Sequence, residues 1–365
     1  MKHSDSLTPR QLTAAAFVAI LSPLVRRYPR ALASSTGRTA WLSPLLLFLP
    51  LAAGIAVLWL FYRKQPPGTG FSDILCTALG KFPGRALTGL YGLWFALYAG
   101  FLLRSGADRF VSTVYPGAAP GLFVIVTALL CTAAALGRTV SVARSAMLFR
   151  PLMAALFGIV FFLSWKDLDV SLLLPLRPED VPANWFGALQ LLNVLSTGAF
   201  LVFFTDRLSG PFRAQDWLGW AIAMPVLILL MTVSCLGVFG PALTAKLRYP
   251  FFMLVRDLSV LGALERAEPV VIALWVLSDF IMISLLLRCA ANNLRFCFGG
   301  AEGQETNPLP VLLCAGLAAA GALAIPGDMA VFELLSETLV PLLHAAFSLV
   351  LPLPVLVIGL LRRKI

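Results

Sequence analysis

Two adjacent arginines, Arg26 and Arg27, lie near the start of the chain in a stretch that is otherwise largely apolar. A guanidinium presents a rigid fork of N–H donors that suits a carboxylate or a phosphate. Together with Ser22, the two arginines could therefore hold the anionic group of a small ligand. The alternative is an internal ion pair with Asp108 or Asp279, which would neutralise the arginines without any ligand.

Two prolines, Pro23 and Pro29, lie on either side of these arginines. Each proline removes a backbone donor and disfavours a continuous helix, so we expect the first helix to break near Ser22 and Pro23. A broken helix that carries charge at membrane depth is typical of transporter binding sites. The alternative is a segment that lies at the membrane interface, with its arginines extended toward the lipid headgroups.

A second polar cluster, formed by Asn193, Ser196, Thr197 and Gly198, interrupts another apolar segment. Such a cluster is a place where a helix can unwind and turn its carbonyls and amides toward a ligand, although small residues also allow neighbouring helices to pack closely. Phe200 could line the same pocket or could face lipid. The predicted ligand-binding residues are therefore Ser22, Pro23, Arg26, Arg27, Asn193, Thr197, Gly198 and Phe200.

Arg104, Asp108 and Arg109 share one expected apolar span, and Asp279 lies in another. Arg104 and Asp108 are four positions apart, so they lie on one helical face and are able to pair locally, as a structural lock or as part of a site. Asp279 has no charged neighbour within a turn of its own helix, so it must be protonated or meet a cation from another helix. With Ser278, it is expected either to form a coupling-ion site or to pair with an arginine of the first span.

The composition places these groups in a membrane protein. Of the 365 residues, 59% are hydrophobic and 13% are charged, whereas soluble domains carry about 25% charged residues. Apolar runs of about 20 residues recur along the chain and predict an all-α integral membrane protein of about ten spans, forming a single transmembrane domain. The expected spans are 11–33, 41–62, 86–113, 119–136, 140–164, 185–205, 216–239, 268–296, 308–325 and 331–361, with a short amphipathic piece at 71–82 and interfacial helices in the loop near 240–266.

Ten spans divide into two sets of five, about 11–164 and about 185–361. The first and sixth spans, both disrupted, occupy corresponding positions if the two sets are inverted repeats. Lysines and arginines are about twice as frequent in the connections on the side of the N-terminus, which predicts that both termini are cytoplasmic.

Other classes of function are not supported by the sequence. The net charge of +10 is dispersed among short connections, which favours contact with lipid headgroups over nucleic acid. Six cysteines form no CxxC motif, and the only histidines are His3 and His344, so no metal site is expected. There is no nucleophile–base pair, Walker loop or GxGxxG fingerprint, and we expect neither enzymatic activity nor a cofactor.

Several fragments, in order along the chain, resemble the GerAB/ArcD/ProY family of spore germination permease subunits. They include TPRQL at 8–12, YPRALASSTGRTAWLSPLL at 28–46, LGVFGPALTAKLRYPFFMLVRDLSV at 236–260 and LGALERAEPVVIALWVLSDFIMIS at 261–284. The resemblance extends from Thr8 to about Leu335. It implies the fold of amino acid–polyamine–organocation transporters, a LeuT-like bundle of two inverted five-helix repeats in which helices 1 and 6 are broken.

The resemblance also implies a function. It points to the permease-like subunit of a spore germinant receptor, in the spore inner membrane or the bacterial plasma membrane, that binds a small-molecule germinant in a central cavity and relays a conformational change. The implied partners are a GerA-type membrane subunit and a GerC-type lipoprotein. The alternative is a stand-alone secondary transporter of amino acids or small organic anions. Family members often carry an acidic residue after the central glycine of span six, where this chain has Ala199 and Phe200.

Overall fold

The computed structural model describes residues 6–257, 268–300 and 307–365, and within these ranges the chain is helical, with one isolated β-bridge between Leu7 and Leu208. The longer helices are α1 (Pro9–Thr36), α3 (Phe48–Tyr62), α5 (Lys81–Thr113), α6 (Pro120–Leu136), α7 (Thr139–Ser164), α8 (Asp180–Leu195), α9 (Leu218–Lys246), α11 (Glu268–Cys297) and α12 (Leu309–Ala324). The shorter helices are α2 (Leu42–Leu46), α4 (Phe71–Leu79), α10 (Pro250–Asp257), α13 (Met329–Leu334), α14 (Val340–Ala345) and α15 (Pro352–Leu361).

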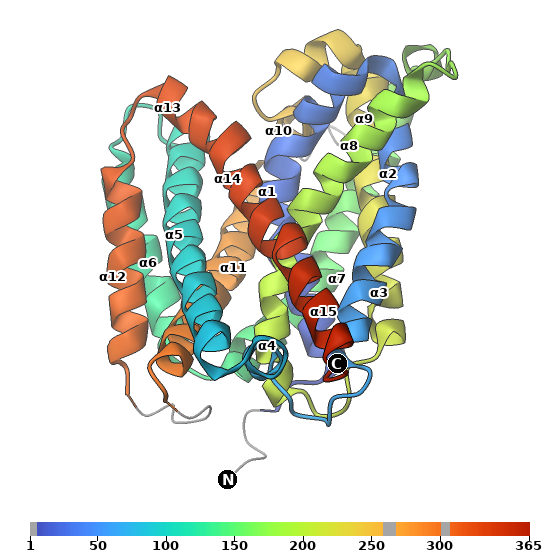
Figure 1. The fold of residues 1–365 in the computed structure, drawn as a ribbon. Helices are drawn as coiled ribbons and strands as arrows, with labels where there is room; N and C mark the ends of the chain where they lie inside the picture. Colours follow the sequence, from blue (N-terminus) through green and yellow to red (C-terminus); the bar gives the residue numbers. More distant parts are fainter. Residues whose placement is uncertain (1–5, 258–267, 301–306) are drawn as a thin grey trace.

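Segments with other helical winding connect or extend these helices. The 3-10 helices are η1 (Gly37–Thr39), η2 (Trp165–Asp167), η3 (Val170–Leu173), η4 (Ser196–Arg207) and η5 (Ala214–Trp217). Two π-helical segments, η6 (Leu335–Leu339) and η7 (Ala346–Val350), lie on either side of α14. Together with α13, α14 and α15 they form one long rod, which crosses the front of the bundle in Figure 1.

The helices have the lengths that a membrane protein requires. Seven helical segments within the described ranges are long and apolar enough to cross a bilayer: Leu42–Tyr62, Lys81–Thr113, Thr139–Asp167, Asp180–Arg207, Ala214–Lys246, Val271–Cys297 and Ala330–Leu361. The helices α6 and α12 are apolar but shorter. Each of the predicted spans overlaps a helix or consecutive helices, and α4 and α10 occupy the places where short helices were predicted. The rest of the loop predicted near 240–266, from residue 258 onward, lies outside the described residues.

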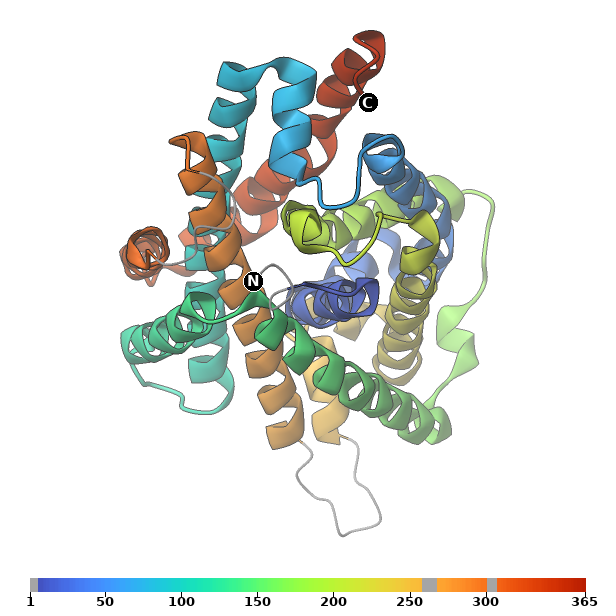
Figure 2. The ribbon, with the colours of Figure 1, turned by 90° about the horizontal axis from the view of Figure 1, so that it is seen from below.

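Helix α1 occupies the middle of the bundle, where it packs against α7, α8, α9 and α11 (Figure 2). Small side chains explain this position, because Ala14, Ala15, Ala16 and Ala19 allow neighbouring helices to approach closely, and all four are buried. The segment is enclosed by protein on several sides. The alternative of an interfacial segment is therefore wrong.

The predicted break in the first helix is also wrong, because α1 is one α-helix over Pro9–Thr36. A side chain from another helix nevertheless bonds to the backbone of α1 at the predicted place. The hydroxyl of Ser278 in α11 donates to the carbonyl of Val18 at 2.6 Å and accepts the backbone N–H of Ser22 at 2.9 Å. These are the two groups that an α-helix pairs with each other, so the Ser278 side chain is inserted into the ladder of α1.

The second disrupted segment changes its winding where the polar cluster lies. Helix α8 ends at Leu195 and continues as the 3-10 helix η4 from Ser196. A 3-10 helix has fewer residues per turn, so the side chains after Ser196 are rotated relative to their positions in a continued α-helix. The chain therefore stays helical through the cluster but changes the face that it presents to α1.

Two glycines provide a test of how tightly the helices pack. A Cβ atom added at Gly100 would lie 2.6 Å from the carbonyl oxygen of Ala318 in α12, whereas one added at Gly198 would meet the end of the Ile20 side chain at 2.7 Å. A backbone atom cannot move away easily, but a side-chain methyl group can.

We expect Gly100→Ala to lower the free energy of unfolding by about 1–3 kcal/mol, and Gly198→Ala to change it by less than about 1 kcal/mol. Unfolding of the purified variants by increasing dodecyl sulfate measures both, and equal effects would contradict the packing described.

Candidate functional site

A large cavity of about 420 Å³ is lined by elements that meet at the end of the bundle where Figure 1 labels α10 and α13. This volume corresponds to about fourteen water molecules at about 30 Å³ each. Its walls come from the C-terminal half of α1, the region before α10, and the segment α13–η6. The charged residues that line it are Arg26, Arg27, Arg30, Arg248, Glu333 and Glu337.

A smaller cavity of about 30 Å³, enough for about one water molecule, lies deeper between α1, α5, α8 and α14. Arg26, Arg27 and Ser336 line both cavities, so the two lie next to each other. The lining of the smaller cavity also includes Pro23, Asn193 and Thr197. The structure therefore brings together five of the eight predicted ligand-binding residues, from two helices that are far apart in the sequence: Pro23, Arg26, Arg27, Asn193 and Thr197.

Neutral groups hold the two arginines in place. Arg26 donates to the hydroxyl of Ser105 in α5 and lies 5.5 Å from the ring centroid of Phe101. Arg27 donates to the backbone carbonyl oxygens of Ser336 at 2.7 Å and Glu337 at 3.2 Å, both in the π-helical segment η6. Neither guanidinium forms an ion pair with a carboxylate in the part of the chain that the structure describes.

The predicted internal ion pair of these arginines is wrong, because Asp108 and Asp279 have other partners. Asp108 pairs with Arg104 at 3.0 Å, as the spacing of four residues predicted. Arg104 also donates to the backbone carbonyl of Ile325 at 2.6 Å, which ties α5 to the segment after α12 and fits a structural lock. Asp279 pairs with Arg109 of α5, and not with an arginine of the first span.

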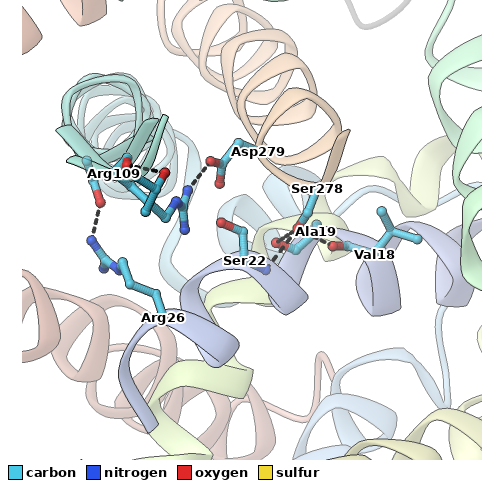
Figure 3. A network of polar contacts seen from close by, with 9 residues as sticks. Val18, Ala19, Ser22, Arg26, Arg109, Ser278 and Asp279 are labelled. Carbon is cyan, nitrogen blue, oxygen red and sulfur yellow. Dashed lines mark hydrogen bonds and ion pairs between the residues drawn. The ribbon is translucent and has the colours of Figure 1, made fainter. Parts of the chain in front are cut away.

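Polar contacts connect α1, α5 and α11 in one network, which Figure 3 shows from close by. On α11, Ser278 bonds to the backbone of α1, and its neighbour Asp279 pairs with Arg109 of α5. On α5, Ser105 lies one helical turn before Arg109 and accepts the hydrogen bond from Arg26 of α1. Helices α1 and α5, which line the smaller cavity, are thus joined to each other and to α11.

Removal of the Ser278 hydroxyl should weaken this network measurably. In Ser278→Ala the hydroxyl that bonds to both groups is lost, but the N–H of Ser22 and the carbonyl of Val18 can still pair with each other within α1, so we expect the free energy of unfolding to fall by about 0.5–1.5 kcal/mol. Ser284→Ala is the matched control, because Ser284 lies on the same helix and its buried hydroxyl forms no hydrogen bond to α1 in the described part of the chain. An equal loss in the two variants, measured by unfolding in dodecyl sulfate, would show that the insertion into α1 contributes nothing.

Three predicted ligand-binding residues lie outside the cavity walls. Ser22 takes part through its backbone, which bonds to Ser278. Gly198 faces Ile20 of α1, in agreement with the close-packing interpretation of the polar cluster. Phe200 is buried, with its ring 6.1 Å from that of Phe95, so the expectation that it faces lipid is wrong.

The structure adds residues that the sequence did not single out for this site. His344 and Tyr98 line the smaller cavity, with their rings packed edge to face at 4.1 Å. Nε2 of His344 and Oδ1 of Asn193 are both buried without a hydrogen-bond partner in the described part of the chain. The sequence signal that could have identified His344 is the presence of a histidine inside an apolar helix. Glu333 and Glu337 line the larger cavity, although the helix dipole alone would account for acidic residues at the start of the last predicted span.

Comparison with known proteins gives two results. A family model described as "Spore germination protein", the spore permease family, matches residues 6–316. Among solved structures, the chain is similar to a Na⁺-coupled sialic acid symporter in a substrate-bound outward-open state, with 12% sequence identity and a TM-score of 0.57 over 95% of this chain and 78% of that one. This likeness shows the fold, that of LeuT-like transporters. Comparison with curated proteins found no match.

Proposed function

Because this chain belongs to the spore germination permease family, we propose that it is the permease-like subunit of a spore germinant receptor. Family and fold make it a permease-like membrane protein. The proposal adds that a small germinant with a negatively charged group binds in the two adjoining cavities, and that binding changes the arrangement of the helices for partner subunits. We place it in the spore inner membrane with both termini cytoplasmic, so that the larger cavity opens away from the cytoplasm.

One observation carries the ligand-binding part of this proposal. Arg26 and Arg27 stand where the two cavities meet, and both are held by uncharged groups. Four arginines but only two glutamates line the larger cavity, so its electrostatic potential favours an anion. A carboxylate at Arg26 and Arg27 would gain charge-assisted hydrogen bonds from both guanidinium groups.

The contact between Arg27 and η6 supports a route from ligand to partner. Arg27 donates to two carbonyl oxygens of η6, and a ligand carboxylate would compete for the same N–H groups. Loss of these bonds would loosen the rod formed by α13, η6, α14, η7 and α15. Only 22% of its most apolar 18-residue stretch is buried within this chain, which leaves the rod accessible to a partner. The germinant can shift this equilibrium only by binding one arrangement more tightly than the other. A GerA-type membrane subunit and a GerC-type lipoprotein are the proposed partners.

The experiment that tests the proposed function is deletion of the gene, followed by germination of the spores on a panel of amino acids, sugars and organic acids. We expect the mutant spores to lose the response to one or a few compounds, at least one of which carries a carboxylate. Restoration by the wild-type gene is the control. An unchanged response to every compound in the panel would contradict the receptor function.

The fold favours one alternative, since the chain is similar in structure to a symporter. A stand-alone secondary transporter would accumulate amino acids or small organic anions in proteoliposomes that contain this chain alone, in response to an ion gradient. The receptor function predicts binding without such accumulation. Uptake measurements with radiolabelled forms of the compounds that trigger germination distinguish the two functions.

A further inference from the structure

The wall that α1 contributes to the larger cavity carries three arginines, Arg26, Arg27 and Arg30. Arg30 follows Arg26 by four positions and Arg27 by three, so the three side chains project from one face of the helix. Residues at these spacings have their Cβ atoms about 5–6 Å apart, and like charges placed there repel each other. The arrangement is therefore unfavourable unless negative charge from elsewhere compensates for it.

The chain itself does not supply that negative charge at the three arginines. None of them forms an ion pair with a carboxylate of the described residues. Arg26 and Arg27 donate to uncharged oxygens, and Arg30 makes no hydrogen bond within the described ranges. All three side chains are half-buried, and none of their unpartnered nitrogen atoms is enclosed by protein. Their free N–H groups can therefore be reached by a solute in the cavity.

We propose that the germinant is a dicarboxylate of four or five carbons, an inference that rests on the proposed function and names the class of ligand for the same cavity. One carboxylate binds Arg26 and Arg27, where the two cavities meet, and the other binds Arg30 in the larger cavity. Arginine suits this role because its fork of donors matches a carboxylate. The two carboxyl groups of so short a chain are separated by a distance similar to one helical turn, about 5.4 Å.

The charge and size of the larger cavity agree with a doubly negative ligand. Four arginines and two glutamates line it, which leaves an excess of two positive charges, and a dicarboxylate carries two negative ones at neutral pH. Glu333 and Glu337 belong to α13 and η6 and not to the α1 wall, and both are exposed, so water and salt screen their repulsion of the ligand. The volume of about 420 Å³ leaves space for the ligand and several water molecules.

The experiment measures how three probes raise the thermal unfolding midpoint of the purified full-length chain in detergent at low ionic strength, since the concentration dependence gives each Kd. The probes are glutarate, its half-amide glutaramate, which has the same length but one charge, and sulfate, which has both charges on one group. We expect glutarate to bind at least about tenfold more tightly than either of the others. Equal affinity for glutaramate would overturn the role of the second charge, and equal affinity for sulfate would overturn binding at two separate points.

Substitution of Arg30 provides the second arm. Arg30→Gln removes the charge and should weaken glutarate binding at least about tenfold, while the binding of glutaramate, with its single carboxylate at Arg26 and Arg27, stays the same. Arg30→Lys keeps the charge and should retain the preference for glutarate. Arg10→Gln is the matched control, because Arg10 is exposed on the same helix and lines neither cavity. A loss of glutarate and glutaramate binding by the same factor in Arg30→Gln would contradict the separate role of Arg30.

Failure of this inference and failure of the proposed function give different results. If glutarate and glutaramate bind equally, and both lose affinity in Arg26→Gln, the cavity is a site for a singly charged anion and the receptor function is unaffected. If deletion of the gene leaves germination unchanged, the receptor function fails, whereas a preference of the purified chain for glutarate would still support binding at two points.

Discussion

Replacement of Arg26 or Arg27 with alanine is expected to raise the germinant concentration needed for half-maximal germination by about ten- to a hundredfold. Hydrogen bonds to charged groups contribute about 1.5–3 kcal/mol each, and about 1.4 kcal/mol corresponds to a tenfold change in affinity. The measurement is the fall in optical density of spores that carry each variant, over a range of germinant concentrations.

The two variants should also differ from each other. Arg27→Ala removes the donors that hold the carbonyls of Ser336 and Glu337, so it should raise the rate of germination without germinant as well. Arg26→Ala leaves that contact with η6 intact and should not. Arg63→Ala is the control, since Arg63 is exposed and lines neither cavity. A wild-type response from both Arg26→Ala and Arg27→Ala would contradict the proposed anion site.

Replacement of Asp279 with alanine should produce the largest loss of stability, about 3–5 kcal/mol of the free energy of unfolding. The reason is that Arg109, which is 4% exposed, would keep its charge without the carboxylate that neutralises it. Removal of both charges in Arg109→Met with Asp279→Leu should recover most of the loss, because no buried charge is left unpaired. Unfolding of purified protein in dodecyl sulfate measures each variant.

Asp108→Ala provides the matched comparison for this prediction. Asp108 is more exposed, with 21% of its side chain accessible, and Arg104 keeps its bond to the carbonyl of Ile325 when the carboxylate is lost. We therefore expect a loss of at most about 1 kcal/mol. If the double variant were as unstable as Asp279→Ala alone, the effect of Asp279 would have a cause other than the unpaired Arg109 charge.

The sequence predicts the helices well because their signal is local. A run of about 20 apolar residues with few charges is long enough to cross a bilayer wherever it occurs. The pairing of Arg104 with Asp108 was predicted for the same reason, since a spacing of four residues places both on one face of a helix. The site residues on α1 and α8 were found because polar groups are rare inside apolar segments.

The features that the sequence did not predict depend on contacts between distant segments. Pro23 indicates that a backbone donor is missing from α1. It does not show that the hydroxyl of Ser278, more than 250 residues later, bonds to the backbone of Val18 and Ser22 nearby. The predicted partner of Asp279 was wrong for a similar reason. Until the helices are placed in space, Arg109 and the arginines of α1 are equally plausible partners. The helix dipole accounts for an acidic residue such as Glu337 near the start of a helical segment, and only the folded chain places it with Arg27 in the lining of one cavity.

The central claim is that the junction of the two cavities favours an anion, and a cysteine at Ser336, which lines both, reports on it directly. The measurement compares the rates at which a negatively charged and a positively charged methanethiosulfonate reagent modify Ser336→Cys. Each rate is divided by the rate at which the same reagent modifies a free thiol in solution. Cys76 and Cys297, the two native cysteines that are not fully buried, are first replaced with alanine. We predict that the anionic reagent reacts at least about tenfold faster and that an effective germinant slows the reaction. Equal rates, or a faster cationic reagent, would contradict the account.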